Sequence, residues 1–303
     1  MKLGPVQRWC ISLALLAATI VWLDPNQVAD EVGSLSPGWL VFALITSIIQ
    51  TGLSAWRWRF TATRLGLTLS PARALADYYL AGFVNQILPG GVLGDAWRAQ
   101  RHARRSGQSG TAWRAVILER ASGQAIVIVL AVLAVVIHEP WRQALETIIF
   151  WVAACLIIAG LLALLAWRRM RAQLGWIEQL RIDAYQALFK ADAWPAQVLS
   201  SLLIVLSYLL VFAAAARGIG ISLPLPELLV MALPVLLAML IPVSVAGWGV
   251  REGAAGLVWW LSGLTPEEGV AAAIAYGVLV LLGSLPGAVV LLLSHSAKAN
   301  VDQ

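Results

Sequence analysis

Long runs of apolar residues alternate with short polar segments from one end of the chain to the other. Six runs come close to the ~20 residues that an α-helix needs to cross ~30 Å of hydrocarbon. We predict full spans at about 9–23, 38–56, 113–137, 147–167, 195–216 and 268–293. The pattern therefore indicates an all-α polytopic membrane protein.

Two further apolar stretches, about 72–88 and 227–241, each end in a Pro/Gly-rich break. A short second helix follows each break, at about 94–105 and 249–262. In lipid, a broken backbone is tolerated only where protein buries it or where it lines a water-filled cavity. We interpret both pairs as re-entrant hairpins that enter and leave on the same side. The alternative is two pairs of tilted, ordinary spans.

Composition agrees with lipid as the solvent, because the 303 residues are 60% hydrophobic and 12% charged, with a mean hydropathy of +0.80. Soluble domains are nearer half apolar and a quarter charged. No stretch is polar and long enough to form a separate soluble domain, so we expect one membrane domain over 1–303. The first span resembles a signal peptide, with Lys2 and Arg8 before it. It lacks a small-residue cleavage site, so we expect it to be retained.

Basic residues are concentrated in alternate loops. With the N-terminus inside, they fall in the N-terminal tail, in 57–73, 98–114 and 168–190, and at Lys298, whereas the outside loops hold Arg142 and Arg217. This bias predicts that both termini are cytoplasmic. The run Arg101–Arg105 is interpreted as an anchor at the membrane surface. Topology explains the net charge of +5 better than a nucleic-acid partner does.

The two breaks carry a related motif. Pro89-x4-Gly94-x3-Arg98 matches Pro242-x4-Gly247-x3-Arg251, 153 positions later and about half the chain away. Each half also reads span, span, interrupted hairpin, span, which predicts repeats at 1–143 and 144–303. Three full spans per half is an odd number, so the second repeat is expected to be inverted. Transporters of this kind bind substrate where the broken helices meet.

Charged residues beside apolar membrane segments are costly, so they face a cavity or pair with one another. Arginine suits phosphate capture, and glycine at a helix start allows backbone N–H groups to approach an anion. The predicted substrate-binding residues are Asn85, Pro89, Gly90, Gly91, Gly94, Asp95, Arg98, Glu119, Arg120, Pro242, Gly247, Gly249, Arg251 and Glu252. In the alternative reading, the glycines only turn the chain and the charges lock the fold.

Catalytic and metal-binding patterns are missing from the sequence. It contains no nucleophile elbow, phosphate loop or nucleotide fingerprint, and no His/Cys cluster with ligand spacing. His102, His138 and His295 are far apart, and Cys10 and Cys155 lie in apolar runs. We therefore expect no enzyme activity, no metal and no cofactor.

The motifs together resemble those of the flippase-like family, also called the lysylphosphatidylglycerol synthase transmembrane family. The resemblance rests on Asn85 to Arg98, on Glu119-Arg120 with Gly123, and on Pro242 to Gly253. Its members, which include YbhN-like proteins of the bacterial inner membrane, resemble the membrane half of the multiple peptide resistance factor. The resemblance implies movement of a phospholipid between leaflets without aminoacyl transfer. Val245-Ala246 departs from the pattern, where another glycine-containing pair is expected.

The leading hypothesis is translocation of a lipid with an anionic or polyprenyl-phosphate-linked headgroup across the bacterial cytoplasmic (inner) membrane. Rocking of one half against the other would give access from alternate sides. A second hypothesis is an accessory subunit that scaffolds a lipid-synthesis enzyme or glycosyltransferase partner. A third is a proton-coupled carrier of a small solute that uses Glu119 or Glu252.

Overall fold

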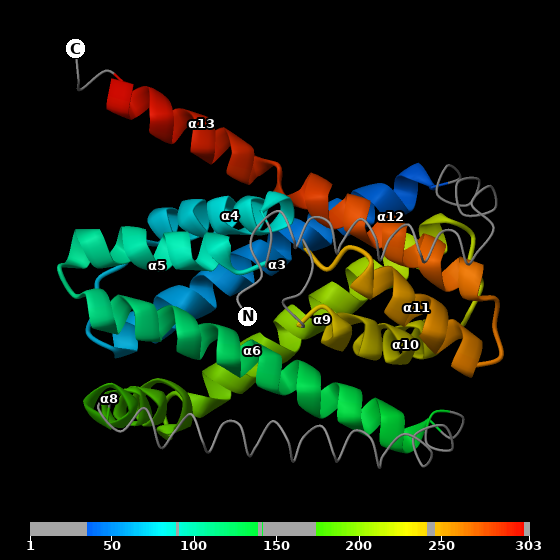
Figure 1. The fold of residues 1–303 in the computed structure, drawn as a ribbon, viewed down its shortest axis with the longest axis horizontal. Coiled ribbons are helices and arrows are strands. Elements are labelled where there is room, and N and C mark those ends of the chain that lie inside the picture. Colours follow the sequence, from blue (N-terminus) through cyan, green and yellow to red (C-terminus); the bar gives the residue numbers. More distant parts are fainter. Residues whose placement is uncertain (1–34, 89–90, 139–140, 142–173, 241–245, 300–303) are drawn as a thin grey trace, which may run out of the picture.

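The computed structural model describes residues 35–88, 91–138, 141, 174–240 and 246–299. This part of the chain is a bundle of helices (Figure 1). In chain order its elements are α3 (Pro37–Arg64), α4 (Pro71–Ile87), α5 (Leu93–Ser106), α6 (Ser109–Ile137), α8 (Leu174–Ala184), the π-helical turn η2 (Tyr185–Phe189), α9 (Trp194–Gly218), α10 (Leu225–Ala238), α11 (Val250–Leu261), α12 (Pro266–Ser284) and α13 (Pro286–Ala299).

Four predicted spans are confirmed as helices of sufficient length and hydropathy to cross a membrane: α3, α6, α9 and the segment Pro266–Leu293. They correspond to the predictions at 38–56, 113–137, 195–216 and 268–293. The predicted spans at 9–23 and 147–167 lie outside the described residues. The protein is therefore a multi-pass membrane protein.

The first of these helices is longer than predicted. Arg57 was assigned to an inside segment, but α3 continues to Arg64 and Arg57 is buried within it, only 4% exposed. The predicted span ended too early because a basic residue after an apolar run usually marks the end of a span. Here partners inside the bundle satisfy the charge, so the helix carries it into the protein.

The last predicted span is not one continuous helix. It is interrupted at Leu285, between α12 and α13, which Figure 1 shows as two helices joined end to end. Proline cannot donate the helical hydrogen bond, and its ring crowds the preceding turn. Beyond the break, α13 packs closely on α4. A Cβ on Gly287 would lie 2.2 Å from the carbonyl oxygen of Tyr79.

Two pairs of short helices occupy the segments predicted as hairpins. α4 packs against α5, and α10 packs against α11. Figure 1 shows the first pair toward one end of the long axis and the second pair toward the other. The tips at 89–90 and 241–245 lie outside the described residues. Of the junctions that follow them, Gly91, Val92, Ala246 and Gly247 line one and the same cavity.

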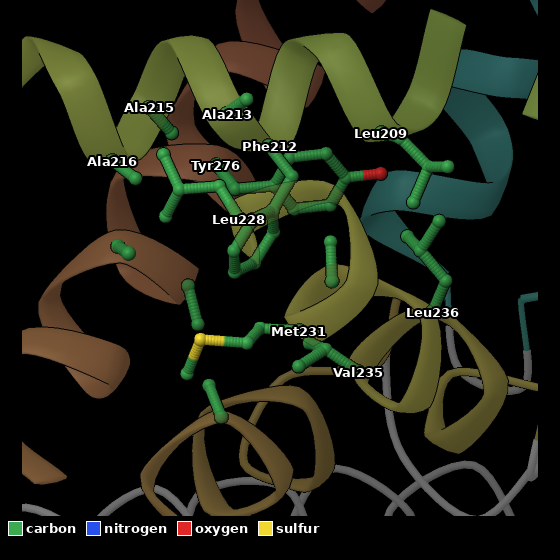
Figure 2. Close-up of a cluster of buried hydrophobic side chains, with 14 of the residues drawn as sticks. Leu209, Phe212, Ala213, Ala215, Ala216, Leu228, Met231, Val235, Leu236 and Tyr276 are labelled. Atoms are coloured by element: carbon green, nitrogen blue, oxygen red, sulfur yellow. The ribbon is translucent and has the colours of Figure 1, made fainter. Parts of the chain in front are cut away.

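The bundle is apolar outside and partly polar inside, as expected of a protein in lipid. Ile45, Ile48 and Ile49 of α3 are each more than half exposed, whereas Ser47 and Ser54 of the same helix are buried. The largest apolar core lies among α9, α10, α11 and α12. Figure 2 shows its centre, where side chains of α9 and α10 pack around Tyr276 of α12.

Segments that were predicted to lie on the same side of the membrane meet in the structure. Arg64 donates to Asp192 at 2.8 Å, and Arg114 donates to Asp183 at 2.6 Å. The Arg64 hydrogen bond holds the pKa of Asp192 below its usual range. The second contact joins the predicted segments 98–114 and 168–190, and Arg64 of 57–73 also donates to the carbonyl of Gln186 in the latter, at 3.1 Å. Toward the other end of the bundle, the backbone N–H of Ser36 donates to the carbonyl of Gly218 at 2.7 Å.

Candidate functional site

A cavity of about 320 Å³ lies in the middle of the bundle. Its wall draws on α3, α4, the start of α5, α6, α9, the end of α10, the segment before α11, and α12. The polar and charged side chains of this wall include Ser47, Gln50, Thr51, Ser54, Arg57, Tyr78, Asn85, Gln86, Asp95, Glu119, Arg120, Gln124 and Tyr208. Both predicted hairpins thus contribute residues to one cavity.

One wall is a polar stripe on α3. Ser47, Gln50, Thr51, Ser54 and Arg57 recur at three- and four-residue spacing and line the cavity. Within a membrane span, such a stripe points toward protein or water rather than lipid. It faces α9, which packs against α3 along its length.

Three side-chain hydrogen bonds join α3 to α9, two of them from this stripe and one from Thr61. Arg57 donates to Ser201 at 2.9 Å, and Gln197 donates to Thr61 at 2.9 Å. Ser207 donates to the side-chain oxygen of Gln50 at 3.3 Å. Hydrogen bonds of this kind hold membrane helices together where apolar contact provides little preference.

Glu119 is the centre of the charged network beside this stripe. Its carboxylate is fully buried and accepts from Arg57 at 2.6 Å on one oxygen and from Arg98 at 2.6 Å on the other. The Tyr78 hydroxyl donates weakly to the same group, at 3.4 Å. A buried carboxylate is tolerated when charged partners surround it in this way. Glu119 therefore ties α6 to α3 and α5.

Arg98 is held by rings as well as by carboxylates. Its guanidinium carbon lies 4.7 Å from the ring centroid of Trp58 and 4.6 Å from that of Tyr78. The side chain is 1% exposed. Within the described residues its Nη1 has no hydrogen-bond partner. Stacking between two aromatic faces compensates such a desolvated cation.

Asp95 extends the network to the cavity surface. It accepts from Arg98 at 2.9 Å, from Arg120 at 2.9 Å and from the Asn85 amide at 2.8 Å. Asn85 in turn accepts from the Gly94 backbone N–H at 2.8 Å. The N–H of Gly94 is therefore bound by the protein itself. The Arg120 side chain is 34% exposed, more than any other charged member of the network.

The second motif forms a smaller, separate unit. Arg251 and Glu252 are both buried and form an ion pair with each other, and Glu252 also accepts from the Gly249 N–H at 2.6 Å. The Arg251 guanidinium lies over the rings of Trp248 and Tyr276, 4.4 and 5.6 Å from their centroids. In this conformation these contacts hold the start of α11.

The glycines of the two motifs serve different purposes. A Cβ on Gly94 would lie 2.0 Å from the carbonyl oxygen of Ala81, so this glycine permits the close crossing of α4 and α5. Gly91, Gly247 and Gly249 have positive φ angles of 59°, 85° and 83°. They turn the chain at the two junctions, and Gly91 and Gly247 also line the cavity.

The structure divides the predicted site residues into three groups. Asn85, Gly91, Asp95, Glu119, Arg120 and Gly247 line the cavity. Gly94, Arg98, Gly249, Arg251 and Glu252 lie outside this wall. Pro89, Gly90 and Pro242 lie outside the described residues.

Several cavity residues were not predicted from the sequence, among them Arg57, Tyr78, Gln50, Gln124 and Tyr208. The spacing of Ser47, Gln50, Thr51, Ser54 and Arg57 was the signal available for the α3 stripe. Over the described part of the chain, His, Cys, Asp and Glu side chains do not gather in groups of three that could hold a metal ion.

Comparison with known proteins gives one family. The family model described as "Lysylphosphatidylglycerol synthase TM region" matches residues 9–287, almost the entire chain. No curated protein and no solved structure matches the chain.

Proposed function

Because the chain belongs to the lysylphosphatidylglycerol synthase transmembrane family, we propose that it moves a phosphate-bearing lipid between the leaflets of the bacterial inner membrane. The headgroup enters the central cavity while the hydrocarbon chains stay in lipid. The single observation that carries this proposal is the cavity itself, where a network of charged residues lies among helices from both halves of the chain.

The cavity wall matches an amphiphilic substrate. Arg57, Asp95, Glu119 and Arg120 provide its charged part, whereas Val205, Leu236 and Val280 belong to its apolar part. A lipid headgroup with the first carbons of its chains has the same polar-to-apolar order. Pockets for small ligands usually combine mostly apolar walls with a few placed polar groups.

Inverted repeats are part of the proposal, and the packing of the helices supports them. The contacts α3–α4, α4–α5 and α5–α6 have counterparts in α9–α10, α10–α11 and α11–α12. Across the halves, α6–α9 corresponds to α12–α3, and α6–α10 to α12–α4. Figure 1 places the two proposed hairpins toward opposite ends of the bundle, as inversion requires. Rocking of one half against the other then opens the cavity to alternate sides.

The proposed orientation places both termini in the cytoplasm. The contacts of Arg64 with Asp192 and of Arg114 with Asp183 support it, because they gather the basic segments on one side.

The test is a leaflet assay on the full-length protein in vesicles. A fluorescent phospholipid is supplied in both leaflets, and an impermeant quencher added outside measures how fast the inner lipid becomes accessible. We expect faster exchange than in empty vesicles, and a large loss for Arg120→Ala. The matched control is Arg181→Ala, since Arg181 is 76% exposed and pairs only with the nearby Glu178 in the described structure. Wild-type protein that moves lipid no faster than empty vesicles would overturn the proposal.

The accessory-subunit hypothesis and the proton-coupled-carrier hypothesis predict other results. An accessory subunit would bind a lipid-synthesis or glycosyltransferase partner and show no transport alone. A proton-coupled carrier would require Glu119 or Glu252 to exchange a proton with a water-soluble substrate. Both acids are buried and paired with arginine in this structure, so this conformation does not favour that alternative.

A further inference from the structure

The charged part of the cavity wall comes from one half of the chain. Arg57, Asp95, Glu119 and Arg120 all lie in the first half. The second half contributes mainly apolar side chains, with the hydroxyls of Tyr208, Tyr276 and Ser284. A bound headgroup is therefore recognised by the first half, and its charge must complement that network.

Among the described residues, the network carries an excess of one positive charge. Three arginines, Arg57, Arg98 and Arg120, connect with two carboxylates, Asp95 and Glu119, through direct ion pairs. The neighbouring pair Arg251–Glu252 adds no net charge. In a site of low dielectric constant, one unmatched charge strongly favours a ligand of opposite sign.

The excess charge is accessible at one residue. The side chains of Arg98 and Glu119 are 1% and 0% exposed, and that of Arg57 is 5% exposed. Arg120 is 34% exposed at the cavity and bonds Asp95 through Nη2 at 2.9 Å. A guanidinium has five donors in a planar fork, so Arg120 can bind a phosphate oxygen while it stays beside Asp95.

The rest of the polar wall is neutral and rich in hydrogen-bonding groups. Gln50, Thr51 and Ser54 line it from α3, and Gln124 lines it one helical turn beyond Arg120. Hydroxyl and amide groups match the alcohol groups of a polyol, whereas an ammonium group would meet no spare carboxylate among the described residues of this wall.

We propose that the lipid is a monoanionic phosphodiester of a neutral, hydroxylated alcohol, with its phosphate on Arg120 and its hydroxyls against Gln50, Thr51 and Gln124. This inference rests on the proposed function and specifies its substrate class. Zwitterionic and cationic headgroups would place a positive charge against a network that already has one in excess. A doubly charged phosphomonoester would leave one negative charge uncompensated.

The experiment compares headgroups on a common acyl chain. Vesicles containing the full-length protein receive tail-labelled phosphatidylglycerol, phosphatidylcholine, lysylphosphatidylglycerol or phosphatidic acid, and exchange between leaflets is measured for each. We expect phosphatidylglycerol to exchange fastest. Equal rates for the four lipids, or a faster rate for any of the other three, would overturn the substrate class while leaving lipid translocation intact.

A charge-changing variant tests the cause of the preference. Gln124→Glu adds one negative charge at the cavity and cancels the excess, so the ratio of phosphatidylglycerol to phosphatidylcholine exchange should fall roughly tenfold. Gln100→Glu is the matched control, because Gln100 is exposed on α5 and does not line the cavity. It should keep the wild-type ratio. An unchanged ratio in Gln124→Glu would overturn the role of the network charge.

A binding measurement tests the proposed substrate class independently of lipid transport. Short-chain dihexanoyl phosphatidylglycerol and dihexanoyl phosphatidylcholine are titrated, below their micelle concentrations, into the purified wild type, Gln124→Glu and Gln100→Glu. Selective binding that Gln124→Glu abolishes supports the substrate class even if no lipid crosses, in which case only the translocation proposal fails. Equal binding of both lipids by the wild type contradicts the inference directly.

Discussion

Arg98 and Glu119, 21 positions apart, meet at 2.6 Å between α5 and α6, where the two side chains are 1% and 0% exposed. Removing one partner of a buried pair leaves the other charge uncompensated. Glu119→Gln therefore removes the carboxylate partner of Arg57 and leaves Arg98 with Asp95 alone. We expect it to lower the free energy of unfolding by about 3 kcal/mol, measured by thermal and denaturant unfolding in detergent.

The control is Glu178→Gln, at an exposed pair with Arg181 on α8. Exposed pairs contribute little, so this variant should unfold like the wild type. If Glu119→Gln proved as stable as the control, the network would not hold the helices together, and its charges would be free for another use.

The close crossing of α4 and α5 predicts that replacing Gly94 by a larger residue destabilises the protein. Alanine there would place its Cβ 2.0 Å from the backbone oxygen of Ala81, which cannot rotate away as a side chain can. The two helices must separate, and overpacking of this kind costs about 1–3 kcal/mol. Gly52→Ala is the matched control, since nothing lies within 4 Å of its Cβ position on α3. Equal stability of the two variants would contradict the close crossing.

At position 246 the opposite result is expected, because replacing Ala246 by glycine should stabilise the protein. Its φ is +50°, in the left-handed region that disfavours a Cβ. The family resemblance implies a glycine in the pair Val245-Ala246. Ala246→Gly should raise the free energy of unfolding by about 0.5 kcal/mol, after the loss of a small buried methyl group. Ala121→Gly, in the interior of helix α6, should instead lower it by about 1 kcal/mol. A lower free energy of unfolding for Ala246→Gly would show that the backbone there is not strained.

The elements of this fold were predictable where a single physical signal dominated. Hydropathy located α3, α6 and α9, because lipid demands a long apolar run. Glu119 and Arg120 were recognised because charges are conspicuous inside such a run. The motif around Pro89 and Pro242 pointed to two junctions that the structure brings to one cavity.

Other features depend on which side of a helix meets which neighbour. Arg57 follows the apolar run of α3, so it was counted with the segment after the span, whereas its hydrogen bonds to Glu119 and Ser201 bury it within the bundle. Arg251 looked equivalent to Arg98 in sequence, but its nearest carboxylate is its own neighbour, Glu252. Long-range pairing decides both cases, and a single sequence contains no direct record of it.

Inversion of the two halves makes a topological prediction at a matched pair of serines. Ser70 and Ser222 are exposed and lie just before α4 and α10, the first arms of the proposed hairpins. If the halves are inverted, these positions face opposite sides of the membrane. Single cysteines are introduced at each in a background where Cys10 and Cys155 are serine, and an impermeant maleimide is applied to intact cells and to inside-out vesicles. Ser70→Cys should react only from the cytoplasmic face and Ser222→Cys only from the other, because the basic segments place residue 70 inside. Permeabilised membranes, where both should react, control for a buried thiol. Labelling of both cysteines from one face would rule out inversion, and with it alternating access by rocking of related halves.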